Sequence, residues 1–214
     1  MEKQINIGFI VFAFIFFITL PFHPYAHSYL IKALPAFIAS MSCFCMLKKP
    51  FDALFMGMGF LLCMSGDIFL DINREVYFVQ GLASFLVGHI FFSLVFARKF
   101  HYSFPKAIKA CLVFIYLGIL SFFIIPHLGS LLIPVTAYMF IIGIMGISAC
   151  FIDVPSPYIL IGASLFVFSD SIIAISKFVL PFNQSLYFII FSYYSALFFI
   201  QYGIRKEYGK TKYK

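Results

Sequence analysis

The chain has 214 residues, of which 63% are hydrophobic and only 11% are charged, and its formal net charge is +7. Apolar residues continue along the whole length, which leaves almost no room for a soluble domain and predicts an integral membrane protein with one transmembrane domain, residues 1–214. Because no basic stripe is joined to a soluble fold, we expect no nucleic-acid partner.

Eight apolar stretches are long enough to cross the hydrocarbon core, which takes about 20 residues of helix. Proline, glycine and charged residues separate them into predicted spans at 5–22, 28–47, 52–71, 76–97, 107–125, 128–148, 156–175 and 184–204. Long runs such as FIIGIMGISACF lack the in-and-out alternation of a barrel strand, so the spans are predicted to be helices. The expected fold is all-α, a polytopic bundle of eight transmembrane helices.

Basic residues predict the orientation of these spans. If both termini are cytoplasmic, twelve lysines and arginines lie on the inner side, and only Arg74 and Lys177 lie in outer loops. This asymmetry follows the positive-inside rule, so both termini are predicted to be cytoplasmic. The expected location is a multi-pass integral protein, in the inner membrane of the cell if the source is bacterial, with membrane lipid as a partner.

Two aspartates, Asp67 and Asp170, lie within predicted spans. An aspartate at the centre of a membrane helix costs at least ~3 kcal/mol, so these two are candidates for a functional, partly wet surface. From a rise of about 1.5 Å per residue, both are expected roughly 8 to 10 Å below the outer hydrocarbon edge, with Lys32 in the same layer. His89 is expected about 10 Å deeper, where it would line the floor of a cavity. The structural alternative for the aspartates is an interhelical hydrogen bond or an ion pair with Lys32.

The other polar residues of the spans also have structural alternatives. Lys32 would snorkel to the outer headgroups, and Asp71 would mark a helix end and its water. His89 would be a neutral histidine bonded to a neighbouring helix. Tyr138 would be a packed aromatic residue with a satisfied hydroxyl.

The two aspartates also suggest an internal duplication. Aligning Asp67 with Asp170 pairs Ile72 with Ile175, four helices apart and in the same direction. This pattern is compatible with a parallel internal repeat, and repeats of this kind often place a site at their interface.

Polar, aromatic and small residues recur through the spans in a fixed order. They are Lys32 with Pro35, Gly66-Asp67 with Leu70, Gly81 with Phe85 and His89, Tyr138 with Met145, Gly162-Ala163 with Phe166, Ser169-Asp170, and Tyr193-Tyr194 with Ala196. In this order and spacing the chain resembles the YhhN-like lysoplasmalogenases, a family of eight-span membrane proteins. It departs from the family at Ala33, where proline is usual, and at Leu197, where glutamine is frequent.

The resemblance implies hydrolysis of the vinyl-ether bond of a lysoplasmalogen, which releases a fatty aldehyde and a glycerophospho-ethanolamine or glycerophosphocholine. Such a bond is cleaved through an oxocarbenium ion, and this route needs an acid, an anion and a water. Two carboxyl groups in a low-dielectric pocket suit that chemistry. The expected catalytic residues are Asp67 and Asp170, with Asp170 as the proton donor and Asp67 as the anion, held ionised by Lys32.

The remaining candidates have supporting roles. They are Lys32, His89, Tyr138, Ser169 and Asp71, which would bind the lysophospholipid substrate or relay a proton. No metal and no other cofactor is expected, because His89 has no second histidine at ligand spacing and no phosphate-binding glycine loop is present. The oligomeric state is not predicted.

A second class of function fits the same residues. Paired intramembrane carboxyl groups, a lysine and a parallel repeat would also suit a proton-coupled carrier or a receptor for a small lipid-like molecule. Broken helices at matching positions of the two halves would favour a carrier. The glycine pairs at Gly57 with Gly59 and at Gly143 with Gly146 lie on the third and sixth spans, which do not correspond in the repeat.

Overall fold

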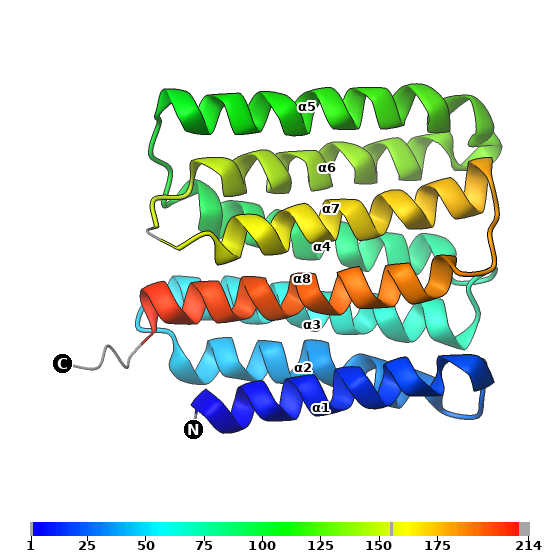
Figure 1. Cartoon of the computed structure of the whole chain (residues 1–214), viewed down its shortest axis with the longest axis horizontal. Coiled ribbons are helices and arrows are strands. Elements are labelled where there is room, and N and C mark those ends of the chain that lie inside the picture. Colours follow the sequence, from blue (N-terminus) through cyan, green and yellow to red (C-terminus); the bar gives the residue numbers. More distant parts are fainter. Residues whose placement is uncertain (1, 155, 210–214) are drawn as a thin grey trace.

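The computed structural model describes residues 2–154 and 156–209, in which eight long helices carry the fold (Figure 1). They are α1 (Glu2–Thr19), α2 (Ser28–Met46), α3 (Pro50–Ile72), α4 (Phe78–Ala97), α5 (Phe104–Ile124), α6 (Leu132–Phe151), α7 (Tyr158–Ala174) and α8 (Ser185–Tyr208). A π-helical turn, Ile175–Val179, continues α7. The predicted spans are confirmed, with ends that shift by a few residues because short helical turns extend several of them.

All eight helices are long and apolar enough to cross a membrane. The protein is therefore an all-α, multi-pass integral membrane protein, as the composition predicts. The start of α1 and the end of α8 lie at the same end of the bundle (Figure 1). Which side of the membrane this end faces stays a prediction from the basic residues.

The helices form a bundle two layers deep at its centre. In Figure 1, α7 and α8 lie in front of α4 and α3, and α5 and α1 lie at the two edges. The largest packing surfaces join α2 to α3, α3 to α4 and α7 to α8, while α6 packs on α4 and α2 packs on α8. The last two contacts are equivalent in a parallel repeat, but α2 packs on α3 far more extensively than α6 packs on α7. The repeat stays a prediction.

Glycines allow close contacts between helices, and two of these contacts position α3 and α7, the helices that carry Asp67 and Asp170. A Cβ atom at Gly66 on α3 would lie 2.5 Å from the Phe85 ring of α4. A Cβ atom at Gly162 on α7 would lie 2.8 Å from the backbone nitrogen of Ile200 on α8. Small residues at such contacts let membrane helices pack closely. Close packing matters there because lipid tails are as apolar as the side chains, so the hydrophobic effect does not drive helices together within the bilayer.

The end of the bundle that holds the start of α3 is tied together by a buried ion pair. Lys99 Nζ lies 2.6 Å from Asp52 Oδ2, and it also lies over the Tyr208 ring at 3.8 Å from the centroid. This contact links the loop after α4 to α3 and α8. Asp67 and Asp170 lie toward the opposite end of the bundle.

Candidate active site

Asp67 and Asp170 lie near the same end of the bundle. Asp67 is on the last turns of α3 and Asp170 is on the last turns of α7. Together with Lys32 and Arg74 they line one small cavity. Three chain segments that are far apart in sequence, α2, α3 with the loop after it, and α7, therefore bring two carboxyl groups and two basic side chains to one cavity.

Each aspartate is held by a tyrosine from another helix. Tyr193 of α8 donates a hydrogen bond of 2.6 Å to Asp67 Oδ2, and Tyr138 of α6 donates to Asp170 Oδ2. Within residues 2–154 and 156–209, neither Oδ1 atom has a protein hydrogen-bond partner. One oxygen of each carboxyl group is thus fixed by a donor, and the other is free to meet a bound molecule.

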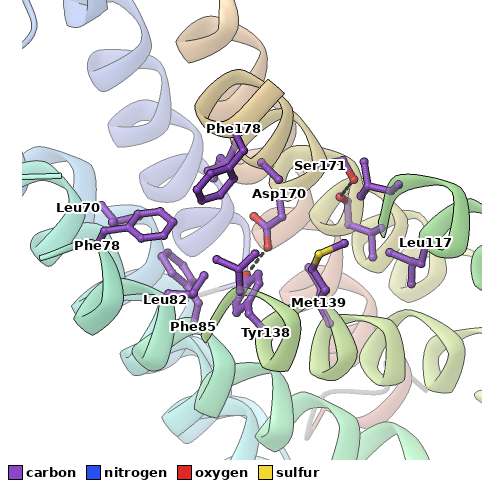
Figure 2. A pocket seen from close by; sticks show the side chains of 16 residues that line it. Leu70, Phe78, Leu82, Phe85, Leu117, Tyr138, Met139, Asp170, Ser171 and Phe178 are labelled. Atoms are coloured by element: carbon purple, nitrogen blue, oxygen red, sulfur yellow. Dashed lines mark hydrogen bonds between the residues drawn. The ribbon is translucent and has the colours of Figure 1, made fainter. Parts of the chain in front are cut away.

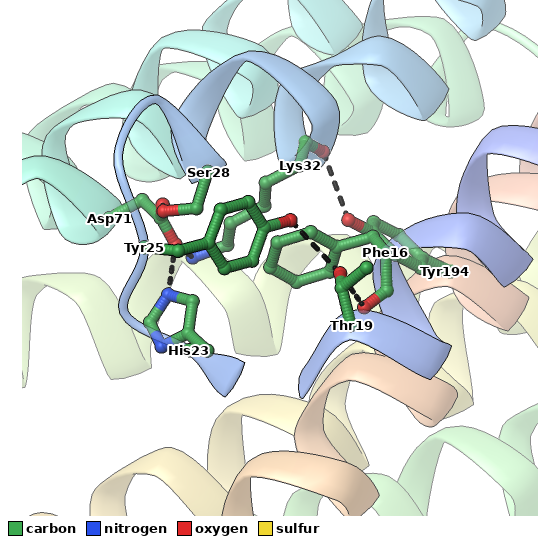
Figure 3. A network of polar contacts seen from close by, with 8 residues as sticks. All are labelled: Phe16, Thr19, His23, Tyr25, Ser28, Lys32, Asp71 and Tyr194. Atoms are coloured by element: carbon green, nitrogen blue, oxygen red, sulfur yellow. Dashed lines mark hydrogen bonds and ion pairs between the residues drawn. The ribbon is translucent and has the colours of Figure 1, made fainter. Parts of the chain in front are cut away.

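Lys32 pairs with Asp71, and not with Asp67 as the sequence analysis expects. Its Nζ lies 3.4 Å from Asp71 Oδ1, which also accepts a hydrogen bond of 2.8 Å from His23 Nε2 (Figure 3). Ser28 donates to Asp71 Oδ2. A helical side chain tilts toward the N-terminus of its own helix, so the Lys32 side chain points toward the start of α2. Asp71, on the last turn of α3, lies beside the start of α2. Lys32 is buried and does not snorkel to the headgroups.

Asp71 does mark the end of α3, but its carboxyl group is not in water. Its side chain is only 1% exposed, and three protein groups surround it. The prediction of a water-facing helix end is wrong on this point. The segment between α1 and α2 folds over the end of α3 and supplies His23, which covers the carboxylate.

The backbone of Lys32 is also fixed. Its carbonyl oxygen accepts a hydrogen bond of 3.0 Å from Tyr194, and next to it Thr19 and Tyr25 share a hydrogen bond of 2.9 Å (Figure 3). Tyr194 follows Tyr193 on α8, so adjacent tyrosines secure Lys32 and Asp67. The Tyr193-Tyr194 pair was part of the family resemblance, and this signal could have identified both as site residues.

His89 lies behind the site and not in a cavity floor. It is fully buried, and its ring packs edge-on against Phe166 and Tyr138, with centroids 4.5 Å and 5.5 Å apart. Neither ring nitrogen makes a well-formed hydrogen bond to the described part of the chain, so the expected bond to a neighbouring helix is absent there. Its contact with Tyr138 places it one side chain away from Asp170.

Two further residues complete the small cavity. Ser169 lines it, but its hydroxyl donates a hydrogen bond of 3.1 Å to the carbonyl of Ile189 and so joins α7 to α8. Arg74, in the loop after α3, also lines this cavity. Burial lowers the pKa of the Arg74 guanidinium and the Asp71 carboxylate opposes this, while arginine keeps its charge in proteins.

A larger cavity adjoins the small one, and the two share several lining residues. Asp170 and Phe85 line both, and the larger cavity is otherwise almost entirely apolar (Figure 2). No group of three or more histidine, cysteine, aspartate or glutamate side chains within the described residues is placed to hold a metal ion. The arrangement places two carboxyl groups and two basic side chains next to an apolar cavity.

The fold and the site define a class: a multi-span membrane protein with paired carboxyl groups at the border of an apolar cavity. The sequence model of the YhhN family matches residues 27–204. The chain belongs to the YhhN family, as the order of its polar and small residues indicates.

Two curated proteins named lysoplasmalogenase are similar to part of the chain. A Bos taurus protein named lysoplasmalogenase TMEM86A is 30% identical over 153 residues, which are 64% of this chain and 60% of the relative. A Mycobacterium bovis protein named lysoplasmalogenase is 33% identical over 142 residues, 64% of this chain and 54% of the relative. The matched regions thus span little more than half the length of these relatives. No solved structure matches the chain with significance.

Proposed function

We propose that this protein is a lysoplasmalogenase-like hydrolase that cleaves the vinyl-ether bond of lysoplasmalogens by acid catalysis at Asp67 and Asp170. The observation that carries the proposal is the shared cavity, in which both carboxyl groups lie with Lys32 and Arg74. The names of the relatives support the reaction class.

The reaction balances with one water. The acid transfers its proton to the β-carbon of the vinyl ether, and the electron pair of the double bond forms the new C–H bond. This leaves an oxocarbenium ion, which the nearby carboxylate stabilises, as in glycoside hydrolysis. Water adds to the cationic carbon and loses a proton to a carboxylate. The hemiacetal then collapses to a fatty aldehyde and the glycerol hydroxyl.

The surroundings of the two aspartates support different roles. Asp170 borders the apolar cavity, where a carboxyl group is most easily kept protonated, so it is assigned as the proton donor. Asp67 does not line the apolar cavity and lines only the small one, with Lys32 and Arg74, so it is assigned as the anion. Lys32 and Arg74 are suited to the phosphate of the substrate.

The test is aldehyde release from lysoplasmenylethanolamine by the purified protein. Asp67→Asn and Asp170→Asn each remove an acid–base group, so kcat is expected to fall by roughly 10² to 10⁴. Asp153→Asn is the matched control, because its side chain is 70% exposed at the opposite end of the bundle, and it should retain wild-type turnover.

Thermal unfolding of each variant shows whether the fold is retained. Wild-type turnover in either site variant would refute the assignment of that aspartate. A wild-type protein that binds the lipid without releasing aldehyde would refute the hydrolase and favour the carrier or receptor.

A further inference from the structure

The larger cavity is suited to hydrocarbon. Three of the residues that line it have polar side chains, and two of these are satisfied within the protein. Tyr138 donates to Asp170, and Ser171 donates a hydrogen bond of 2.7 Å to the carbonyl of Val167 (Figure 2). Asp170 alone offers an unpaired oxygen within the described chain. A guest of this cavity therefore needs no polar group except where it meets Asp170.

The cavity is adjacent to the lipid-facing surface as well as to the polar site. A groove between α5 and α6 runs along the outside of the bundle, where Phe114 and Phe140 are 68% and 69% exposed. Leu117 of α5 and Met139 of α6 line both this groove and the larger cavity. These two side chains therefore lie between the groove and the apolar cavity.

We propose that the alkenyl chain of the substrate enters sideways from the bilayer, between α5 and α6, and passes Leu117 and Met139 to lie in the larger cavity. The proposal rests on the proposed function. In this arrangement the chain lies along α5, α6 and α7, its vinyl-ether bond reaches Asp170, and the phosphate points toward Arg74. Leu117 and Met139 then form a lateral gate.

Local packing suits such a gate. A Cβ atom at Gly143 would lie 3.0 Å from Leu117 Cδ1, so the leucine rests against bare backbone of α6 and has no interlocking side chain there. Gly118, next along α5, has no atom within 4 Å of an added Cβ. Met139 is unbranched and changes rotamer readily. Of the eight helices, α5 is the least buried, and its main contact is with α6.

The position of the chain is tested with a saturated ether lysophospholipid that carries a diazirine at the end of its chain. The protein in nanodiscs is photolysed, and the labelled peptides are mapped by mass spectrometry. Labelling of α5 and α6 around Leu117 and Met139 that unlabelled lipid displaces is the expected result. Labelling confined to the groove of α1 and α8 around Phe14 and Phe198, or labelling that unlabelled lipid does not displace, would overturn the proposal.

A second experiment compares substrates of long and short chains. Leu117→Trp narrows the gate, so kcat/KM for a chain of about 16 carbons should fall about tenfold more than for one of about 6 carbons, the effect of losing roughly two buried methylene groups. Leu112→Trp is the matched control on the exposed face of α5, away from both cavities and the groove, and should keep the wild-type ratio. Equal changes for the two chains in Leu117→Trp would overturn the proposal.

The two experiments separate this proposal from the proposed function. The labelled lipid has no vinyl-ether bond, so its binding site is mapped whether or not the protein hydrolyses anything. Displaceable labelling at the gate without aldehyde release from wild-type protein would refute the hydrolase and support the chain site.

Discussion

Asp67 and Asp71 lie one turn apart on α3, but their partners differ. Among the residues that the structure describes, Asp67 accepts one hydrogen bond, from Tyr193, and it faces a cavity. Asp71 is surrounded by His23, Ser28 and Lys32 and does not line that cavity. The three partners of Asp71 give it a structural role. Asp67 keeps one carboxyl oxygen available to contact a substrate in the cavity.

Asp71→Ala should therefore reduce stability. The substitution leaves the buried Lys32 cation without its carboxylate, and breaking a buried pair in this way costs about 3 kcal/mol. The unfolding temperature in detergent is expected to drop by several degrees. Glu75→Ala, an exposed carboxylate in the following loop, is the control and should change it little. An unchanged unfolding temperature for Asp71→Ala would show that this network does not hold the fold.

At the scale of helices, close packing sets where the aspartates sit. Gly162 lets α7 contact the backbone of α8, which brings Asp170 and Tyr193 of α8 to a common cavity. On α5, by contrast, Gly118 makes no close helix contact, because an added Cβ there would have no atom within 4 Å. Two glycines in similar apolar helices thus have different structural roles.

Gly162→Ala should destabilise the protein, since the added Cβ would lie 2.9 Å from the carbonyl oxygen of Ala196 and must push the helices apart. Gly118→Ala meets nothing within 4 Å and should be neutral or slightly stabilising, because alanine is the better helix former. Unfolding temperatures of the two variants provide the comparison. Equal values would contradict the close packing of α7 on α8.

At the scale of the whole molecule, the candidate site lies at the end of the bundle opposite the start of α1 and the end of α8 (Figure 1). The distribution of lysines and arginines predicts that the termini are cytoplasmic, which places the site near the outer face. Substrate headgroups would then be drawn from the outer leaflet.

Cysteine labelling tests this orientation. Asn183→Cys lies in the loop between α7 and α8, and Lys48→Cys lies in the loop between α2 and α3. A membrane-impermeant maleimide should label the first in intact cells and the second only after permeabilisation. The opposite pattern would place the aspartates near the cytoplasm.

The amino-acid sequence by itself determined the membrane spans, because a helix must satisfy its backbone within the bilayer and needs about 20 apolar residues to cross it. It also made Asp67 and Asp170 the leading candidates for a site, since an ionisable side chain within an apolar membrane span is energetically costly. Only the tertiary structure decided the partners. Lys32 meets Asp71, the tyrosines bind the catalytic candidates, and His89 lies behind Tyr138. These contacts join different helices, and they depend on how each helix is rotated and packed, which the spacing of residues along one helix does not specify.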